Sequence, residues 1–166
     1  MSDYTKVIVF ILVLIIFSAT VIYLYNSESS MNAVMPDISS NIVAGDSDYN
    51  EAVNLLNDKN YGEARNKAIS AQNNFNHSMS QILDIKDNFT DDINDVHRNY
   101  INAILSELEL KLNATEYLLK AIDSYERYEN ATGNEYAQQA NYYMNEALEF
   151  QKVRNDLVKD NPNLFK

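Results

Sequence analysis

The sequence contains no cysteine, and its 166 residues include only three glycines and two prolines. Without cysteine there can be no disulfide, no thiol nucleophile and no thiolate metal site. So few glycines and prolines argue against the many tight turns of a β-sandwich and favour long uninterrupted helices. A domain formed by this chain must therefore be held together by an apolar core between helices.

Basic residues are also scarce, and the formal net charge is -11. A surface this acidic repels DNA and RNA, so no nucleic-acid partner is expected. The sequence shows no glycine-rich phosphate loop, no nucleophile with a base and no metal triad, and we therefore expect neither an enzyme nor a cofactor. Two classes rank ahead of an enzyme of unrecognised type: a binding or scaffolding module, and a ligand-sensing or accessory subunit of a membrane complex.

One long apolar run lies near the N-terminus, where residues 7–25 carry no charged side chain. As a helix this run spans about 28 Å, close to the hydrocarbon thickness of a bilayer. It is longer than the apolar region of a signal peptide, and no small-x-small cleavage site follows it. We therefore predict a retained transmembrane anchor over 7–25. Lys6 precedes it and acidic residues follow, which predicts residues 1–6 in the cytoplasm and the C-terminal domain outside the cell membrane.

The rest of the chain predicts an all-α fold: a tether, then an elongated antiparallel bundle of one short and three long helices. Residues 26–46 show no sustained period and are predicted to form a flexible linker. The bundle is expected over 47–161, followed by a C-terminal tail at 162–166. Ser47 or Asp48 is expected to cap the short helix, which should cover about 48–58.

The three long helices are predicted from apolar residues that alternate at spacings of three and four. The first should run from Tyr61 to about Phe89. The second should be capped by Thr90 or Asp91 and continue for about 40 residues, because nothing interrupts its pattern before Gly133.

The last helix should end near Asp160, because Pro162 cannot continue it. Short connections make successive helices antiparallel, so the first and last long helices should fold back on opposite ends of the middle one and overlap along its centre. The middle helix also carries three acid-before-base pairs at i,i+4, which are interpreted as solvated surface pairs. These are Glu107 with Lys111, Glu116 with Lys120, and Asp123 with Arg127.

Residues 52–71, "AVNLLNDKNYGEARNKAISA", resemble a tetratricopeptide-type helical hairpin. The resemblance lies at packing positions and at the turn: Ala52, Leu55, Tyr61, Ala64 and Ala71. No closing proline follows, and no second copy occurs at a 34-residue period. A peptide-binding solenoid is therefore an alternative to an ordinary helical hairpin.

Two acidic stretches are compared with cation sites. Asp46, Asp48 and Asn50 are spaced like calcium-loop ligands, but Glu51 stands where such a loop needs glycine, and helix capping is the preferred interpretation. Five aspartates between residues 84 and 95 gather around one predicted turn, as a weak cation site or simply a solvated helix junction.

The only histidines, His77 and His97, are expected about 9 Å apart along the bundle. They are therefore not predicted to share a metal ion.

Tyrosines concentrate at the predicted turn between the last two helices, and this cluster is the best candidate for binding. It consists of Tyr117, Tyr125, Tyr128, Tyr136, Tyr142 and Tyr143. Tyrosine rings suit glycan stacking or protein contacts, although they also occur at the rim of a bundle with the hydroxyl in water. We expect a non-enzymatic binding or scaffolding module for an envelope protein or glycan. The heptad-like helices also permit a homo-oligomer.

Four N-x-S/T sequons provide acceptor sites for glycosylation on an exported surface. They begin at Asn76, Asn88, Asn113 and Asn130. Their use would establish the predicted topology.

Overall fold

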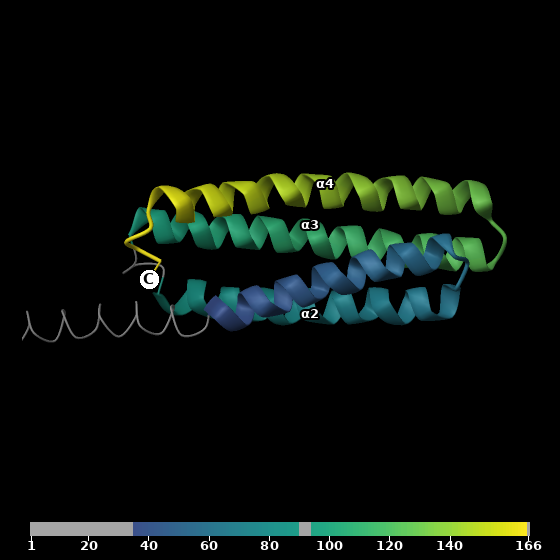
Figure 1. The fold of residues 1–166 in the computed structure, drawn as a ribbon, viewed down its shortest axis with the longest axis horizontal. Coiled ribbons are helices and arrows are strands. Elements are labelled where there is room, and N and C mark those ends of the chain that lie inside the picture. Colours follow the sequence, from purple (N-terminus) through teal and green to yellow (C-terminus); the bar gives the residue numbers. More distant parts are fainter. Residues whose placement is uncertain (1–34, 90–93, 166) are drawn as a thin grey trace, which may run out of the picture.

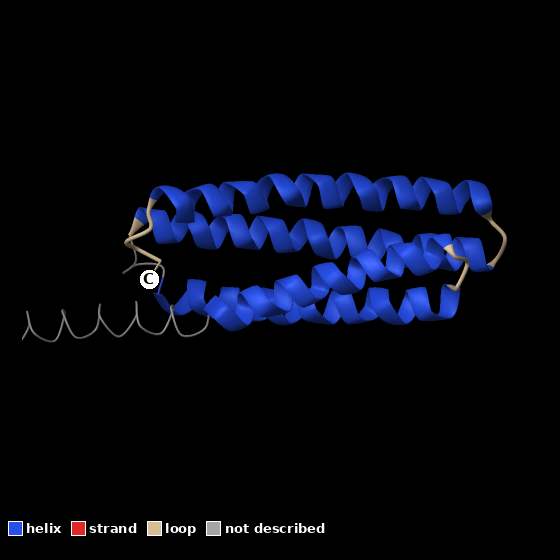
Figure 2. Cartoon of the chain, in the orientation of Figure 1, coloured by secondary structure: helices blue, strands red, loops and turns tan. Residues whose placement is uncertain are grey.

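The computed structural model describes residues 35–89 and 94–165, which form a bundle of four antiparallel helices (Figures 1 and 2). A helical segment over 35–57 is followed by α2 (Tyr61–Phe89), α3 (Asp95–Glu126) and α4 (Asn130–Asp160). No strand occurs in these two ranges. The predicted all-α antiparallel bundle is confirmed.

The predicted anchor at 7–25 and the predicted cytoplasmic residues 1–6 lie outside the described residues. Within 35–89 and 94–165, no helix combines the length and the hydrophobicity that crossing a bilayer requires.

The linker predicted over 26–46 is wrong for residues 35–46, which are helical and continue into the helix expected at 48–58. Ser47 and Asp48 therefore lie inside a helix and cap nothing. The buried residues of the segment alternate at spacings of four and three: Ile38, Ile42, Gly45, Tyr49 and Ala52. Burying each isoleucine stabilises the helix by about 1.5 to 3 kcal/mol, which outweighs the poor helix propensity of its serines and asparagines.

Asp48 joins segment 35–57 to α2. Its carboxylate accepts hydrogen bonds from Lys67 Nζ at 3.0 Å, from Ser70 Oγ at 2.6 Å and from Asn74 Nδ2 at 3.3 Å. Burial by itself would raise the pKa of Asp48, but the Ser70 hydrogen bond and the Lys67 ammonium outweigh it and hold the pKa below its usual value. Because residues 46–57 are helical, the calcium-loop alternative is excluded.

The heptad spacing predicted for α2 is confirmed by its buried residues, which are Ala64, Ala68, Ala71, Phe75, Ser78, Ile82 and Ile85. The central helix is α3, which contacts both α2 and α4, whereas the described parts of α2 and α4 do not contact each other. Figure 1 shows α2 and α4 running along α3 on either side of it. They fold back from opposite ends of α3, as predicted, and their overlap extends along most of α3 instead of its centre alone.

Both ends of α3 differ from the prediction. Thr90 and Asp91 lie outside the described residues, and the cap is Asn94, whose Oδ1 accepts a hydrogen bond from the His97 backbone N–H at 3.0 Å. The helix ends at Glu126. Tyr128 follows with φ at 63°, and the next N–H, of Glu129, bonds to the Ser124 carbonyl at 2.9 Å. This is the Schellman pattern that closes many helices, usually with glycine at the left-handed position.

Gly133 is not the predicted break. It lies inside α4 and is buried, and a Cβ added there would be 3.0 Å from the ring of Tyr125. The buried residues of α4 recur every seven positions: Gly133, Ala140, Ala147 and Arg154. Small side chains at this spacing let α4 approach α3 closely. The predicted end at Asp160, before Pro162, is confirmed.

The C-terminal tail folds back onto the start of α3. The ring of Phe165 lies 5.1 Å from that of His97 and 4.9 Å from that of Tyr100, measured between centroids. His97 Nε2 is 2.9 Å from the Leu164 carbonyl oxygen. This end of the bundle is opposite the turns at 58–60 and 127–129 (Figure 1).

Candidate functional site

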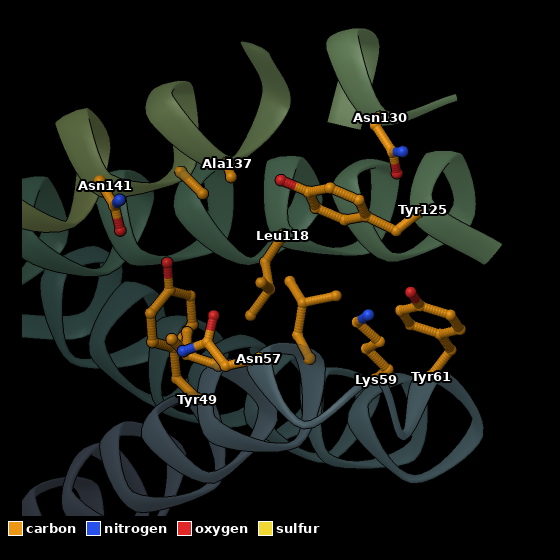
Figure 3. Close-up of a pocket in the computed structure, with 12 residues that line it drawn as sticks. Tyr49, Asn57, Lys59, Tyr61, Leu118, Tyr125, Asn130, Ala137 and Asn141 are labelled. Atoms are coloured by element: carbon orange, nitrogen blue, oxygen red, sulfur yellow. The ribbon is translucent and has the colours of Figure 1, made fainter. Parts of the chain in front are cut away.

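A pocket of about 400 Å³ lies at the end of the bundle that carries the turns at 58–60 and 127–129 (Figure 3). It opens between segment 35–57, the C-terminal part of α3 and the N-terminal half of α4. Its polar lining consists of Tyr49, Asn57, Lys59, Tyr61, Tyr125, Asn130 and Asn141, and its apolar lining of Val53, Leu56, Leu118, Ala137 and Ala140. This volume falls within the range of about 300 to 1,000 Å³ of small-molecule sites.

The pocket exists because α4 presents small side chains here. Ala137 and Ala140 line it from α4, where leucines would fill the space. On the other side, segment 35–57 ends with Val53 and Leu56 turned toward Leu118 of α3, which gives the pocket an apolar floor. The phenol and amide groups then surround this floor, so the lining can both stack on a ring and form hydrogen bonds.

Tyr49 supplies the most deeply buried polar group of the pocket. The residue is 4 % exposed, and its hydroxyl has no hydrogen-bond partner among the described residues. In Figure 3 the hydroxyl points up from segment 35–57 toward α4. Burial raises the pKa of Tyr49 to about 12. A buried phenol without a partner is costly, and a ligand or water molecule in the pocket would provide the missing hydrogen bond.

Lys59 lies in the turn between segment 35–57 and α2, and Figure 3 shows its ammonium directed into the pocket. Its φ is 61°, and the turn is closed by hydrogen bonds from its N–H to the Leu56 carbonyl at 3.0 Å and from the Asn60 N–H to the Leu55 carbonyl at 2.8 Å. This is the same Schellman pattern as at Tyr128. Glycine is favoured at such a position, because any Cβ is crowded in the left-handed conformation.

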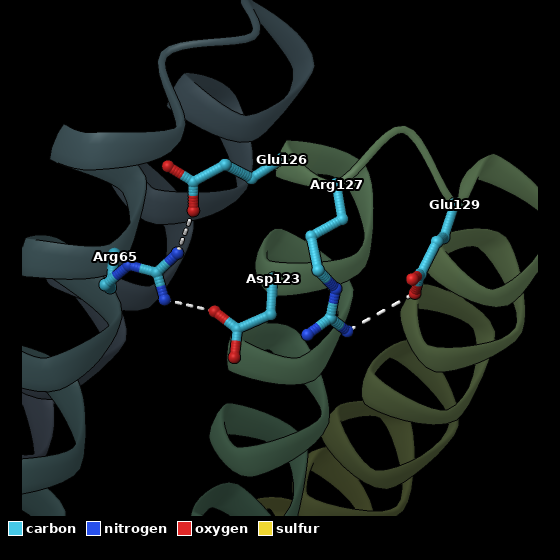
Figure 4. Close-up of polar contacts among 5 residues, drawn as sticks. All are labelled: Arg65, Asp123, Glu126, Arg127 and Glu129. Atoms are coloured by element: carbon cyan, nitrogen blue, oxygen red, sulfur yellow. Dashed lines mark hydrogen bonds and ion pairs between the residues drawn. The ribbon is translucent and has the colours of Figure 1, made fainter.

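Ion pairs hold the helices together next to the pocket (Figure 4). Arg65 of α2 pairs with both Asp123 and Glu126 of α3. Arg127 pairs with Glu129 across the turn, at 3.3 Å. The predicted pair of Asp123 with Arg127 is therefore replaced by other partners, whereas the predicted surface pair of Glu116 with Lys120 is confirmed at 2.6 Å.

The six predicted tyrosines divide into separate groups. Only Tyr125 lines the pocket, and its hydroxyl donates a hydrogen bond to Asn134 Oδ1. Tyr128 is 88 % exposed in the turn. The other four rings contact one another between α3 and α4, with Tyr117 stacked on Tyr143 at 5.4 Å and 6.1 Å from Tyr136, and Tyr142 edge-on to Tyr143 at 5.5 Å.

Sequence reasoning missed most of the pocket. Tyr49 lies inside the short helix predicted at 48–58, but it was not recognised because the heptad pattern was not followed back into residues 35–46. Lys59 and Tyr61 border a turn that the sequence does predict, but nothing in the sequence places them against α4. The signal that could have found Tyr49 is the spacing of Ile38, Ile42 and Gly45, which continues the pattern of the helix backward.

A cluster of buried charges lies between segment 35–57, α3 and α4. Lys111 Nζ is 2.7 Å from the Asp46 carboxylate and 2.8 Å from Glu107 Oε1, and Glu107 Oε2 is 3.2 Å from Arg154 Nε. Glu107 and Lys111 are fully buried, so their interpretation as a solvated pair is wrong. The Glu107 contacts are ion pairs by distance and lack hydrogen-bond alignment. Two carboxylates face two cations, and the cluster therefore needs no further counter-ion.

The remaining candidates do not form a site. His77 of α2 is exposed, with its Nε2 4.0 Å from an Asp37 carboxylate oxygen. His97 is buried at the start of α3, where its Nε2 contacts the Leu164 carbonyl. Among the described residues, no group of three or more His, Asp or Glu side chains is placed to hold a metal ion. Asp91 and Asp92 of the predicted acidic turn lie outside the described residues.

The sequon asparagines differ in exposure. Asn76, Asn88 and Asn130 are exposed, and Asn113 is half-buried. Asn130 also lines the pocket.

Comparison with known proteins gave no match to any family model, curated protein or solved structure. The interpretation of the pocket therefore depends on its geometry and chemistry.

Proposed function

We propose that this protein is a non-enzymatic binding module, anchored in the cell membrane through residues 7–25, whose pocket holds one sugar ring of an envelope glycan outside the cell. The observation that carries this proposal is the Tyr49 hydroxyl, which is buried in a pocket of about 400 Å³ without a hydrogen-bond partner among the described residues. The tertiary fold leaves this hydroxyl unsatisfied on a residue that lines the pocket.

The chemistry of the lining suits a pyranose ring. Three phenols and three amides surround the pocket, and each of these groups can donate and accept hydrogen bonds, as sugar hydroxyls require. Tyrosine rings offer flat apolar surfaces against which the C–H face of a sugar can pack. Val53, Leu56 and Leu118 complete the apolar floor.

The arrangement of the bundle also fits a module that reaches away from a membrane. Segment 35–57 runs from one end of the bundle, where Met35 begins it, to the turn at 58–60 beside the pocket at the other end (Figure 1). The helix between them spans about 35 Å. An anchor at 7–25 would hold the bundle by the end that contains Met35, so the pocket would face outward.

A direct binding measurement tests the proposal. The purified full chain in detergent micelles is titrated with hexoses and short envelope oligosaccharides, and binding is followed by saturation-transfer NMR and calorimetry. We expect Asn141→Ala, which removes an exposed lining amide, to weaken binding about fivefold to tenfold. Asn145→Ala, one turn further along α4 and outside the lining, is the control and should bind normally. The absence of binding by any sugar would contradict the proposal.

Topology is tested separately in cells. Protease added to intact cells should cleave the bundle, and the mature chain should keep residues 7–25. A mature N-terminus near Asn26 in the culture fluid, or a bundle protected from the protease, would contradict membrane anchoring with the domain outside.

A protein partner is a second candidate, and the exposure of Tyr128 favours it. The ring is 88 % exposed and sits at a left-handed backbone position that disfavours large side chains. Exposed tyrosines are frequent anchors of protein interfaces. In this alternative the module would be an accessory or sensing subunit of a membrane complex. Crosslinking from the nearby exposed position 131 in cells should then trap one envelope protein, and Tyr128→Ser should abolish that product.

A further inference from the structure

We infer that the sugar bound in this pocket is acidic, and that Lys59 binds its carboxylate; this inference rests on the function proposed above. Three features of the molecule identify the ligand class: the charge of the pocket lining, the backbone conformation of Lys59, and the ion pairs formed by the other cations.

The charge of the pocket differs from that of the protein as a whole. Its twelve lining residues include one lysine and no aspartate or glutamate, on a chain whose formal net charge is -11. The acids nearest in sequence to the lining residue Tyr125 are held by arginines, with Asp123 and Glu126 bound to Arg65. Asp58 precedes Lys59 in the chain but does not line the pocket. Among the lining side chains, an anion therefore meets a single ammonium group and neutral donors.

Lys59 occupies a backbone position where glycine would make the folded chain more stable. Its φ of 61° is left-handed, and its side chain makes no ion pair with the described residues that would compensate for this conformation. Strained positions of this kind concentrate at binding sites. The turn directs the ammonium into the pocket (Figure 3), which is what binding of a carboxylate requires.

Most other cations of the bundle are already engaged. Ion pairs with described carboxylates involve Arg65, Lys67, Arg98, Lys111, Lys120, Arg127 and Arg154. Lys59 differs from these residues because it faces a pocket whose other lining residues are neutral. A charge-assisted hydrogen bond to a carboxylate is roughly twice as strong as a neutral one, so an acidic sugar should bind more tightly than its neutral counterpart.

The test compares matched ligands on the full chain in detergent micelles at low salt. D-Galacturonate, D-galactose, tri-galacturonate and a short neutral peptide with a free C-terminal carboxylate are titrated by calorimetry. We expect galacturonate to bind at least about tenfold more tightly than galactose. Lys59→Gln should weaken galacturonate binding about tenfold and so remove this preference, and Lys59→Arg should keep most of it. Lys152→Gln, which changes an exposed lysine of α4 outside the pocket, is the control.

Each outcome bears on a different claim. Equal affinity for galactose and galacturonate would overturn this inference and leave the proposed sugar site standing. No binding of any sugar would overturn both. Tighter binding of a short peptide through its terminal carboxylate would also overturn the inference, in favour of a protein ligand. Tighter binding of tri-galacturonate than of the monomer would assign the site to a polymer, and the reverse would assign it to a free sugar acid.

Discussion

Arg154 Nε of α4 lies 3.2 Å from Glu107 Oε2 of α3, in a contact whose carboxylate is completely buried. Glu107 also contacts Lys111, and Lys111 reaches Asp46 in segment 35–57. The chain of charges thus connects three helices across the same seam that opens into the pocket. Tyr100 lies beside it, where burial raises the pKa of its hydroxyl.

Breaking this chain at one end should be severe. Arg154→Leu removes one of the two cations that balance Glu107 and Asp46, and leaves a buried carboxylate with less compensation. We expect the free energy of unfolding to fall by about 3 kcal/mol or more. Urea denaturation of the full chain measures it. Lys152→Ala on the exposed side of α4 should change stability by less than about 0.5 kcal/mol.

Replacing the whole cluster tests whether it stabilises the fold or specifies the alignment of the helices. With Asp46→Asn, Glu107→Leu, Lys111→Met and Arg154→Leu together, no buried charge remains unpaired, and stability should be equal to or above that of the natural chain. A large loss in this fourfold variant would show that the ion pairs are net stabilising.

Two glycines provide a matched comparison of packing. A Cβ at Gly45 would lie 2.4 Å from Cε1 of the fully buried Phe75, so Gly45→Ala should destabilise the bundle by about 1 to 3 kcal/mol. At Gly62 no atom lies within 4 Å, and Gly62→Ala should stabilise by about 0.5 kcal/mol through the unfolded state. Thermal unfolding of both variants measures these two changes in stability. If Gly45→Ala is tolerated as well as Gly62→Ala, the close approach of segment 35–57 to Phe75 is wrong.

The two residues with left-handed backbone conformations, Lys59 and Tyr128, should each lower the stability of the fold. Lys59→Gly and Tyr128→Gly should each stabilise the chain by about 1 kcal/mol, because glycine adopts φ near 60° without crowding. Chemical denaturation measures this gain. Ala at the same positions serves as a control, since it keeps the Cβ and should give no such gain.

Alkaline pH should weaken the fold through Tyr49. Its pKa is about 12 in the folded protein against 10 for the ordinary side chain, so the unfolded chain ionises first. The stability contributed by the neutral phenol is complete below pH 10, and at most about 3 kcal/mol is lost as the pH rises through 12. Tyr49→Phe should unfold at higher pH than the natural chain. An identical alkaline midpoint for both chains would contradict the burial of this hydroxyl.

The sequence anticipated the parts of the fold that depend on regular periodicity. The start and end of α2 and the end of α4 follow from apolar spacing and from Pro162, because these signals are local. Gly133 was misread for a physical reason: a glycine that ends a helix and one that admits a neighbouring ring look the same in the sequence. The helix at 35–46 was missed because its stability comes from contacts with α2 that lie 30 or more residues away, such as that between Ser78 and the Ile38 carbonyl.

By itself, the sequence determined the helical class, the antiparallel order and the acidity of this protein, since composition and periodicity act within a few turns of a chain. Tertiary structure alone decided which charges are buried and where a pocket remains. Glu107 and Lys111 read as an ordinary surface pair until Asp46 and Arg154 are brought against them from distant helices. Likewise, Tyr49, Lys59 and Tyr125 line one pocket only because α4 packs there with alanines instead of larger side chains, since the space left between helices depends on all of them at once.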